Sequence, residues 1–275
     1  MKPTPRNNAK LMYNLPRDTV ATLESMGSMG EIDNLYLALN RFSYRQLDRG
    51  RWPSEPHGYK RNLSNKRPPI ILAINQRMEA IVNSLPFKID IIYKPEKLMI
   101  GTLSPYGNIS LVALHPVYGI PYIPGSALKG AIRNCWIQEN YGGNEKNALK
   151  DKLFQSLFGI GADEKEIANK GSLIFFDAFP MDSYTIRFDV QTPHFKDYYD
   201  NQGAKAPTDD ISPTPLFLTA VTDTTFRIRI GISNPEILDQ PIEIIKNGIS
   251  MALSDYGIGA KTAIGYGIGE VEVID

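Results

Sequence analysis

The chain has 275 residues, and its 30 lysines and arginines balance 30 acidic residues. A chain of zero net charge has no global positive field, so any contact with RNA must come from local patches or from an assembly that shares the charge. A single cysteine, Cys135, excludes an internal disulfide and fits a reducing compartment. Neither a signal-peptide pattern nor an apolar run of roughly 20 residues is present, so we expect a soluble cytoplasmic protein with no membrane contact.

The sequence does not indicate a metal site or a catalytic constellation. The three histidines (His57, His115 and His194) are scattered, and the chain contains no paired cysteines and no His-Glu-x-x-His motif. Asp177 interrupts an apolar strand pattern and could act as a general base, but no acid or histidine accompanies it at a readable spacing. A capping or ion-pair role is the stronger interpretation. We therefore predict no enzyme activity, no catalytic residues, no metal and no cofactor.

Residues 1–85 are expected to form an N-terminal arm and a helical extension. Two helical apolar patterns begin near residues 18 and 35, with glycines 27 and 30 between them. Three arginines then follow at four-residue spacing: Arg41, Arg45 and Arg49. This spacing places them on one stripe of a helix. The stripe is either an ordinary solvated face or a contact for RNA or an acidic neighbour.

Residues 86–275 read as a domain of alternating strands and helices. Strand patterns cover 87–93, 98–103, 109–114, 171–179, 184–190, 216–221, 225–230 and 268–274. Helical patterns cover 70–85, a segment that starts near Ser126, and 237–253. Residues 216–221 and 225–230 are expected to form a hairpin with its turn at 222–224.

The helix that starts near Ser126 is the first candidate anion site. Two prolines hold the approach extended, and Ser126 is placed to cap the helix. Its buried side would consist of Leu128, Ile132 and Cys135. Lys129 and Arg133 share another face, and a helix N-terminus with a lysine one turn in could bind phosphate. The alternative is a capped surface helix with ordinary cations.

A glycine-rich segment over 257–267 is the second candidate. It would expose N–H groups and approach a phosphate backbone closely; its candidate RNA-binding residues are Gly257, Gly259, Lys261, Thr262, Gly265, Tyr266 and Gly267. A plain glycine-rich turn before an edge strand is the alternative. A nucleotide-binding loop is disfavoured, because Ala260 precedes Lys261 and a strand follows. A third candidate loop contributes Thr192, His194 and Lys196, next to two tyrosines that could stack on bases.

Three separated segments together resemble the RAMP superfamily of CRISPR-associated proteins. They are Ile-Pro-Gly-Ser-Ala-Leu-Lys-Gly-Ala-Ile-Arg (123–133), Leu-Phe-Gly (157–159) before Gly-x-Leu-x-Phe-x-Asp-Ala (171–178), and the glycine-rich segment 257–267. Within this superfamily, 189–199 followed by 213–221 is similar to the sixth-subunit family of the type III-B Cmr effector complexes. The resemblance spans about 87–274 and does not include the N-terminal helical part.

The resemblance implies an α+β domain with the ferredoxin-like (RRM-like) βαββαβ fold and several insertions. It also implies a non-catalytic RNA-binding backbone subunit of an antiviral Cmr complex, capping the filament near the crRNA 3′ end. Its partners would be crRNA, target RNA, and the adjacent backbone and terminal RAMP subunits. Target cleavage in such complexes belongs to a different subunit.

Two other functions stay open. Some RAMP proteins cut precursor crRNA without a metal, in which case His115 or His194 would act as general base and Lys261 or Tyr266 would steady charge. The chain could also be a structural connector that does not touch RNA.

Overall fold

The computed structural model describes residues 11–12, 17–18, 21, 25, 34–40, 45–46, 62–64, 68–101, 109–110, 112–161, 168–191, 216–234 and 242–274. The chain forms two compact units, one of residues 1–63, 103–120 and 187–219 and the other of residues 64–102, 121–186 and 220–275. The candidate residues Arg41, Arg49, Thr192, His194 and Lys196 lie outside the described residues. The domain boundary expected near residue 85 stays a prediction.

The second unit is built around one antiparallel sheet. Its strands are β4 (Phe87–Pro95), β8 (Leu173–Phe175), β9 (Phe179–Pro180), β12 (Phe226–Ile232) and β13 (Gly269–Ile274). They lie in the order β13-β4-β12-β8, and β9 also pairs with β12. Helix α4 (Gly125–Tyr141) lies between β4 and β8 in the chain, and helix α8 (Ile242–Met251) lies between β12 and β13. These elements confirm the predicted strands near 90, 175 and 228 and the last strand.

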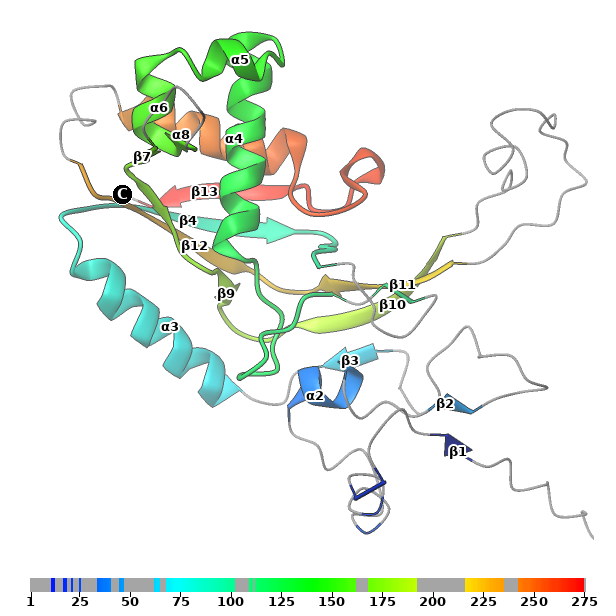
Figure 1. Cartoon of the computed structure of the whole chain (residues 1–275). Coiled ribbons are helices and arrows are strands. Elements are labelled where there is room, and N and C mark those ends of the chain that lie inside the picture. Colours follow the sequence, from blue (N-terminus) through cyan, green and yellow to red (C-terminus); the bar gives the residue numbers. More distant parts are fainter. Residues whose placement is uncertain are drawn as a thin grey trace, which may run out of the picture. The chain divides into compact units, whose positions relative to one another are not determined.

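The main core lies between this sheet and the two helices α4 and α8, which cover the same face (Figure 1). Side chains alternate along a strand, so every second residue of β4 and β12 points to this face. In the middle of both strands these residues are apolar and fully buried: Ile89, Ile91, Tyr93, Phe226, Ile228 and Ile230. The predicted inner side of α4 is confirmed as well, since Leu128, Ile132 and Cys135 are each at most 1% exposed.

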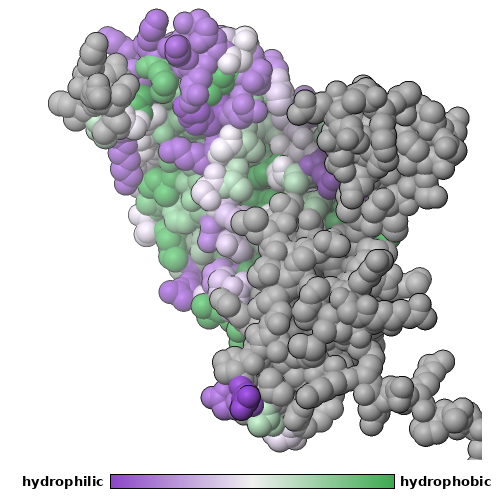
Figure 2. Space-filling view, turned by 45° about the vertical axis from the view of Figure 1, so that its right-hand side comes forward, coloured by the Kyte–Doolittle hydropathy of each residue, from purple (hydrophilic) through white to green (hydrophobic). Residues whose placement is uncertain are grey.

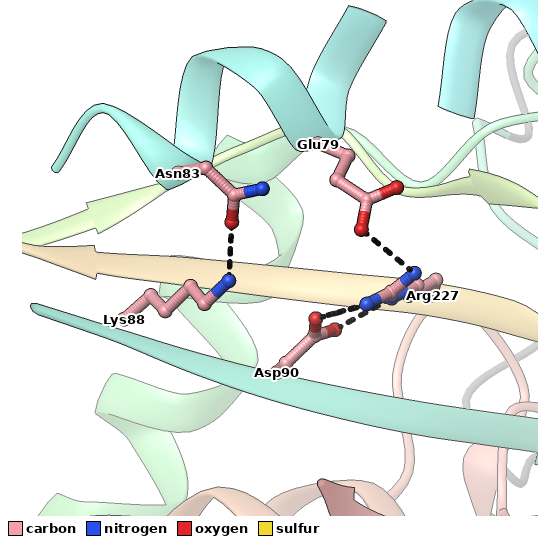
Figure 3. A network of polar contacts seen from close by, with 5 residues as sticks. All are labelled: Glu79, Asn83, Lys88, Asp90 and Arg227. Atoms are coloured by element: carbon pink, nitrogen blue, oxygen red, sulfur yellow. Dashed lines mark hydrogen bonds and ion pairs between the residues drawn. The ribbon is translucent and has the colours of Figure 1, made fainter. Parts of the chain in front are cut away.

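Helix α3 (Pro68–Asn83) covers the opposite face of the sheet, where the contacts are polar (Figures 1 and 3). Arg227 of β12 donates hydrogen bonds to both carboxylate oxygens of Asp90 of β4. The distances are 2.6 Å from Nη2 to Oδ2 and 2.9 Å from Nε to Oδ1. Glu79 of α3 lies 3.9 Å from the same guanidinium, and Lys88 donates to Asn83. Charged pairs therefore join this helix to the sheet, in addition to the apolar contacts of its inner face.

A second arginine lies beside this network. Arg229 stands directly opposite Asp90 in the β4–β12 register, and it is only 3% exposed. Its Nη2 has no hydrogen-bond partner, and burial together with the charge of Arg227 lowers the pKa of its guanidinium. Loss of Asp90 would leave Arg227 without its two-oxygen partner and remove the negative charge opposite the buried Arg229.

The remaining elements complete the described residues. The helices are α2 (Leu35–Asn40), α5 (Glu145–Ala148), α6 (Lys152–Phe158), the π-helix η3 (Ala252–Tyr256) and the 3-10 turn η4 (Thr262–Ile264). The short strands are β1 (Leu11–Met12), β2 (Arg45–Gln46), β6 (Gly159–Ile160) and β7 (Asn169–Lys170). A four-stranded sheet has the order β3 (Asn62–Ser64), β10 (Thr185–Gln191), β11 (Leu216–Thr222), β5 (Ile109–Ser110). No helix within the described residues is long and apolar enough to span a bilayer.

Three predictions about local structure were wrong. The strands β11 and β12 are consecutive but belong to different sheets, so 216–230 is not a hairpin; the break lies at 223–225, where Asp223 takes a positive φ of 53°. Within its described residues, 98–101, the predicted strand 98–103 forms a single bridge, from Leu98 to Val221. Arg45 lies in strand β2, where it pairs with Met12, and so it is not part of the predicted helix.

Candidate nucleic-acid interface

The start of α4 is capped from another strand. The N-cap residue is Pro124, and the N–H of Gly125 donates to Oδ1 of Asp177 at 2.8 Å. A Cβ at Gly125 would lie 2.4 Å from the carbonyl oxygen of Phe175, so glycine allows the helix to begin directly against the sheet. The predicted capping role of Asp177 is confirmed. The predicted cap at Ser126 was wrong, and this exposed residue lies inside the first turn.

Asp177 places a negative group at the helix end where a phosphate was expected. A carboxylate at this position satisfies an unpaired N–H and interacts favourably with the helix dipole. Its side chain is exposed, so it forms a cap at the surface rather than a buried ion pair. The first anion site is thus occupied by the protein's own carboxylate.

The two cations of α4 differ in their surroundings. Arg133 pairs with Glu145 at 2.7 Å, and its guanidinium lies 5.1 Å from the ring centre of Phe154. It therefore fixes α5 and α6 against α4. Lys129 is half-buried, and no ion pair of this lysine occurs in the described part of the chain. Of the pair that the sequence singled out, only Lys129 is left to meet a ligand.

The base of the glycine-rich segment is closed by hydrogen bonds to the chain itself. Gly267 donates to the carbonyl of Lys97 at 2.6 Å, Ala260 to Met99 at 2.8 Å, and Ile258 to Gly267 at 2.8 Å. The expectation that these N–H groups are exposed was wrong. The bonds to Lys97 and Met99 join the loop to the segment after β4, which lies more than about 160 residues earlier in the sequence, and the third bond closes the loop on itself.

The glycines of this base permit close approach to neighbouring backbone rather than to a ligand. A Cβ at Gly267 would lie 1.9 Å from the carbonyl oxygen of Ile258, and a Cβ at Gly259 would lie 2.3 Å from that of Met99. Gly257, Gly259 and Gly267 also have positive φ angles. The backbone at all three positions is therefore accessible only to glycine.

Tyr266 is part of the core of this loop. It is 6% exposed, and Nζ of Lys97 lies 5.6 Å from its ring centre. The hydroxyl of Tyr93 donates to the carbonyl of Gly267 at 2.6 Å, and burial raises the pKa of that tyrosine. Tyr266 thus has no free face for a base in this conformation. Lys97 was not singled out by sequence, because nothing local relates it to residue 266.

The tip of the loop is the part that faces solvent. It runs from Lys261 through η4 to Gly265, and no atom lies within 4 Å of a Cβ placed at Gly265. Lys261 is exposed and takes a left-handed conformation with φ of 64°, which is unusual for a side chain with a Cβ. Ile264 is 61% exposed. In Figure 1 this red segment projects beyond the end of the sheet.

Helix α4 meets the segment before the loop through its C-terminal half. Tyr256 donates to Glu139 at 2.5 Å, and this bond raises the pKa of the tyrosine to about 12. A Cβ at Gly248 would lie 2.8 Å from the Trp136 ring. At 1.5 Å per residue, these contacts lie about 15 Å (Trp136) and about 20 Å (Glu139) along the helix from Ser126. The two candidate sites thus belong to one packed substructure, but the contacts between them lie far from the start of α4.

His115 and Cys135 are both engaged within the protein. Nδ1 of His115 accepts from the N–H groups of Val117 and Tyr118 at 3.3 Å each. Cys135 is buried, which, with the charge of Glu139, raises the pKa of its thiol to about 11. Within the described residues, no three His, Cys, Asp or Glu side chains are grouped to hold a metal ion.

The model of the RAMP superfamily matches residues 97–270. The chain belongs to the RAMP superfamily. That match covers both candidate sites, the capping Asp177 and Lys97, so all of them lie within the RAMP region.

Two RAMP relatives and one solved structure are similar to the chain. The CRISPR system Cmr subunit Cmr6 of Pyrococcus furiosus is 29% identical over 54% of this chain and 58% of that protein. The CRISPR system Cms endoribonuclease Csm3 of Streptococcus thermophilus is 30% identical over 58% of this chain and 72% of that protein. A cryo-EM structure of the type III-B Cmr-beta complex bound to cognate target RNA contains a chain with a TM-score of 0.55 and 22% identity, covering 77% of this chain and 69% of that one.

The chain spans between 56% and 58% of the length of the curated Cmr6 relatives it matches. The likeness to the Cmr-beta chain is a likeness of fold. Together these similarities confirm that this is a RAMP protein with an α+β fold of the kind found in type III CRISPR proteins.

Proposed function

We propose that this RAMP protein is a non-catalytic RNA-binding backbone subunit of a type III-B Cmr effector complex, holding crRNA near its 3′ end. The observation that carries the proposal is the placement of two exposed or half-exposed lysines, Lys129 and Lys261, on one substructure of a RAMP domain. Contacts of this kind grip sugar and phosphate without reading sequence. A neutral chain can contribute such a local contact where neighbouring subunits add theirs.

We further propose that the second unit is a ferredoxin-like βαββαβ domain. The sheet order β13-β4-β12-β8, with α4 and α8 on one face, supports this assignment. In chain order the strands would be first (β4), second (β8), third (β12) and fourth (β13). The glycine-rich loop then joins the second helix to the last strand.

Fewer residues are proposed to touch RNA than the sequence suggested. Ser126, Lys129, Lys261 and Thr262 are exposed or half-exposed and lie at the helix start and the loop tip. Arg133 is engaged with Glu145, and Tyr266 and the glycines of the loop base act inside the protein. We assign these residues to shaping the contact rather than to touching RNA.

The test is the double variant Lys129→Glu/Lys261→Glu in the assembled complex. Reversing two phosphate contacts should reduce crRNA retention at least tenfold and flatten its dependence on salt. The matched control is the pair Lys146→Glu/Lys150→Glu, which lies on exposed positions at the hydrophilic end of the molecule around α5 (Figure 2). Unchanged retention in the first variant, or an equal loss in both, would contradict the proposed contact.

A second candidate function follows from the similarity to Csm3, which is named an endoribonuclease. In that case the chain would process precursor crRNA, with His194 as general base. Incubation of the purified protein with precursor RNA tests this directly. Specific cleavage that is lost in His194→Ala would replace the non-catalytic proposal, and absence of cleavage with intact crRNA retention would support it. A connector without RNA contact would show no crosslink between RNA and Lys129 or Lys261.

A further inference from the structure

Lys97 contacts the glycine-rich loop twice, once through its backbone and once through its side chain. Its carbonyl accepts from the N–H of Gly267 at 2.6 Å, and its Nζ lies 5.6 Å from the ring centre of Tyr266. Any residue at position 97 could supply the carbonyl. The second contact needs a cation, because the attraction is between a positive charge and the face of an aromatic ring.

Tyr266 connects this contact to Lys261. The N–H of Tyr266 donates to the carbonyl of Lys261 at 3.3 Å, and the N–H of Ile264 donates to the same carbonyl at 3.1 Å. The side chain of Tyr266 is buried, so its position is set by the groups that pack on it. A shift of this ring would therefore move one of the two N–H groups that hold the Lys261 carbonyl.

The backbone of Lys261 depends on such a restraint. Its φ of 64° lies in the left-handed region, which a residue with a Cβ occupies only where the surrounding structure holds it there. Lys261 is exposed, and the direction of its side chain follows from this backbone conformation. A change of φ at this position would point the side chain elsewhere.

Two other contacts of the loop act on its base instead. The hydroxyl of Tyr93 and the N–H of Ile258 both donate to the carbonyl of Gly267, at 2.6 Å and 2.8 Å. They restrain Gly267 rather than the turn that begins at Lys261. The Lys97 side chain differs from them, because it contacts the residue that bonds directly to Lys261.

We propose that Lys97 is a positioning residue for the RNA contact of Lys261. Its ammonium group holds the Tyr266 ring, and through Tyr266 it keeps Lys261 in the left-handed conformation that directs this lysine toward RNA. The positioning itself follows from contacts within the chain. Its consequence for crRNA rests on the proposed function.

The first experiment measures the positioning without RNA, by amide-resolved hydrogen exchange of the isolated chain. The N–H groups of Ile264 and Tyr266 should exchange about threefold faster in Lys97→Met, the factor that corresponds to loss of a cation–π contact near the surface. Lys97→Arg keeps a cation and should resemble the wild type. The N–H of Gly267 is the internal reference, because its acceptor is the backbone carbonyl of residue 97.

The second experiment measures crRNA retention in the assembled complex. Lys97→Met should lower retention about threefold on its own. It should cause no further loss in Lys261→Met, because the side chain that Lys97 positions is then absent. The matched control is Lys94→Met, since Lys94 is an exposed lysine of β4 that pairs with Glu270 at 3.7 Å. Its loss should leave retention unchanged.

Three results would overturn the proposal. One is unchanged exchange at Ile264 and Tyr266 in Lys97→Met. Another is equal acceleration at Gly267, which would mean that Lys97 stabilises the whole loop base. The third is an equal loss of retention with and without Lys261, and a weaker salt dependence would then identify a direct contact of Lys97 with RNA.

Failure of the proposed function gives a different result. In that case Lys97→Met would still accelerate exchange at Ile264 and Tyr266, but crRNA retention would not depend on Lys261. This outcome would remove the RNA contact and support the positioning of Lys261 by Lys97.

Discussion

The start of α4 and the glycine-rich loop were both predicted to bind an anion through unpaired N–H groups. In the structure, N–H groups at both places already have acceptors within the protein, but the acceptors differ in kind. At α4 the acceptor is the exposed side-chain carboxylate of Asp177. In the loop the acceptors are backbone carbonyls of Lys97, Met99 and Gly267. A side chain can rotate away from its donor without disturbing the fold, whereas a backbone carbonyl cannot.

The start of α4 can therefore exchange its acceptor for another anion, whereas the N–H groups at the base of the glycine-rich loop are closed to a ligand. A phosphate could compete with Asp177 for the end of α4, at the cost of one capping bond. It could not reach the N–H groups at the loop base unless the loop came apart. The base of the loop is therefore structural, and any ligand contact must come from its tip.

The largest expected loss of stability comes from a substitution at the base of the glycine-rich loop. Gly267→Ala should lower the free energy of unfolding by about 3 kcal/mol or more, because its Cβ would overlap the Ile258 carbonyl at a positive φ. Gly265→Ala is the matched control, since it has a positive φ but open space, and should cost about 1 kcal/mol. Chemical denaturation of both variants measures the difference. Equal costs would mean that the base is not tightly packed.

A smaller loss of stability is expected from removing the cap at the start of α4. Asp177→Ala should cost about 1 kcal/mol, as expected for loss of a helix cap. Asp177→Asn keeps an acceptor for the Gly125 N–H and should cost less. If a phosphate can take the place of this carboxylate, both variants should bind single-stranded RNA more tightly at low salt than the wild type. Weaker binding would show that Asp177 does not compete with phosphate.

The smallest effect concerns the backbone at the tip. Lys261→Gly removes the strain of a left-handed side-chain residue and should change stability by only about 0.5 kcal/mol, in the stabilising direction. The same variant loses a cation, so crRNA retention should fall while stability does not. Asparagine adopts the left-handed backbone readily, so Lys261→Asn removes the charge while keeping a side chain at this position. It shows whether a loss of crRNA retention comes from the charge or from the backbone. A loss of stability in Lys261→Gly would mean that the lysine side chain holds the turn.

Sequence reasoning succeeded where periodicity and burial act locally. The alternation of residues 87–93 predicted the strand β4, and the helical spacing of Leu128, Ile132 and Cys135 predicted the inner side of α4. Of the two roles predicted for Asp177, a cap or an ion pair, the structure confirms the cap, since Oδ1 of Asp177 accepts from the Gly125 N–H. The family resemblance added the order of the motifs, and the match over 97–270 confirmed the superfamily.

Sequence reasoning failed where the partner of a group lies far away in the chain. Nothing near residue 267 indicates that its N–H bonds to Lys97, and nothing near Ser126 indicates that Gly125 is capped by Asp177 instead. The prediction of a hairpin over 216–230 was wrong for a related reason, because the consecutive strands β11 and β12 pair with strands of different sheets. Hydrogen-bond partners across a sheet are set by tertiary packing, which local propensity does not encode.

The sequence by itself thus determined that the chain is a RAMP protein, which side of α4 is buried, and that its glycines over 257–267 mark an unusual backbone. Only the tertiary structure decided what those glycines accomplish. They let the loop pack against the Met99 and Ile258 carbonyls, which leaves the turn from Lys261 to Gly265 as the exposed part. The physical reason is that every buried N–H needs an acceptor, and the fold supplies that acceptor before any ligand arrives.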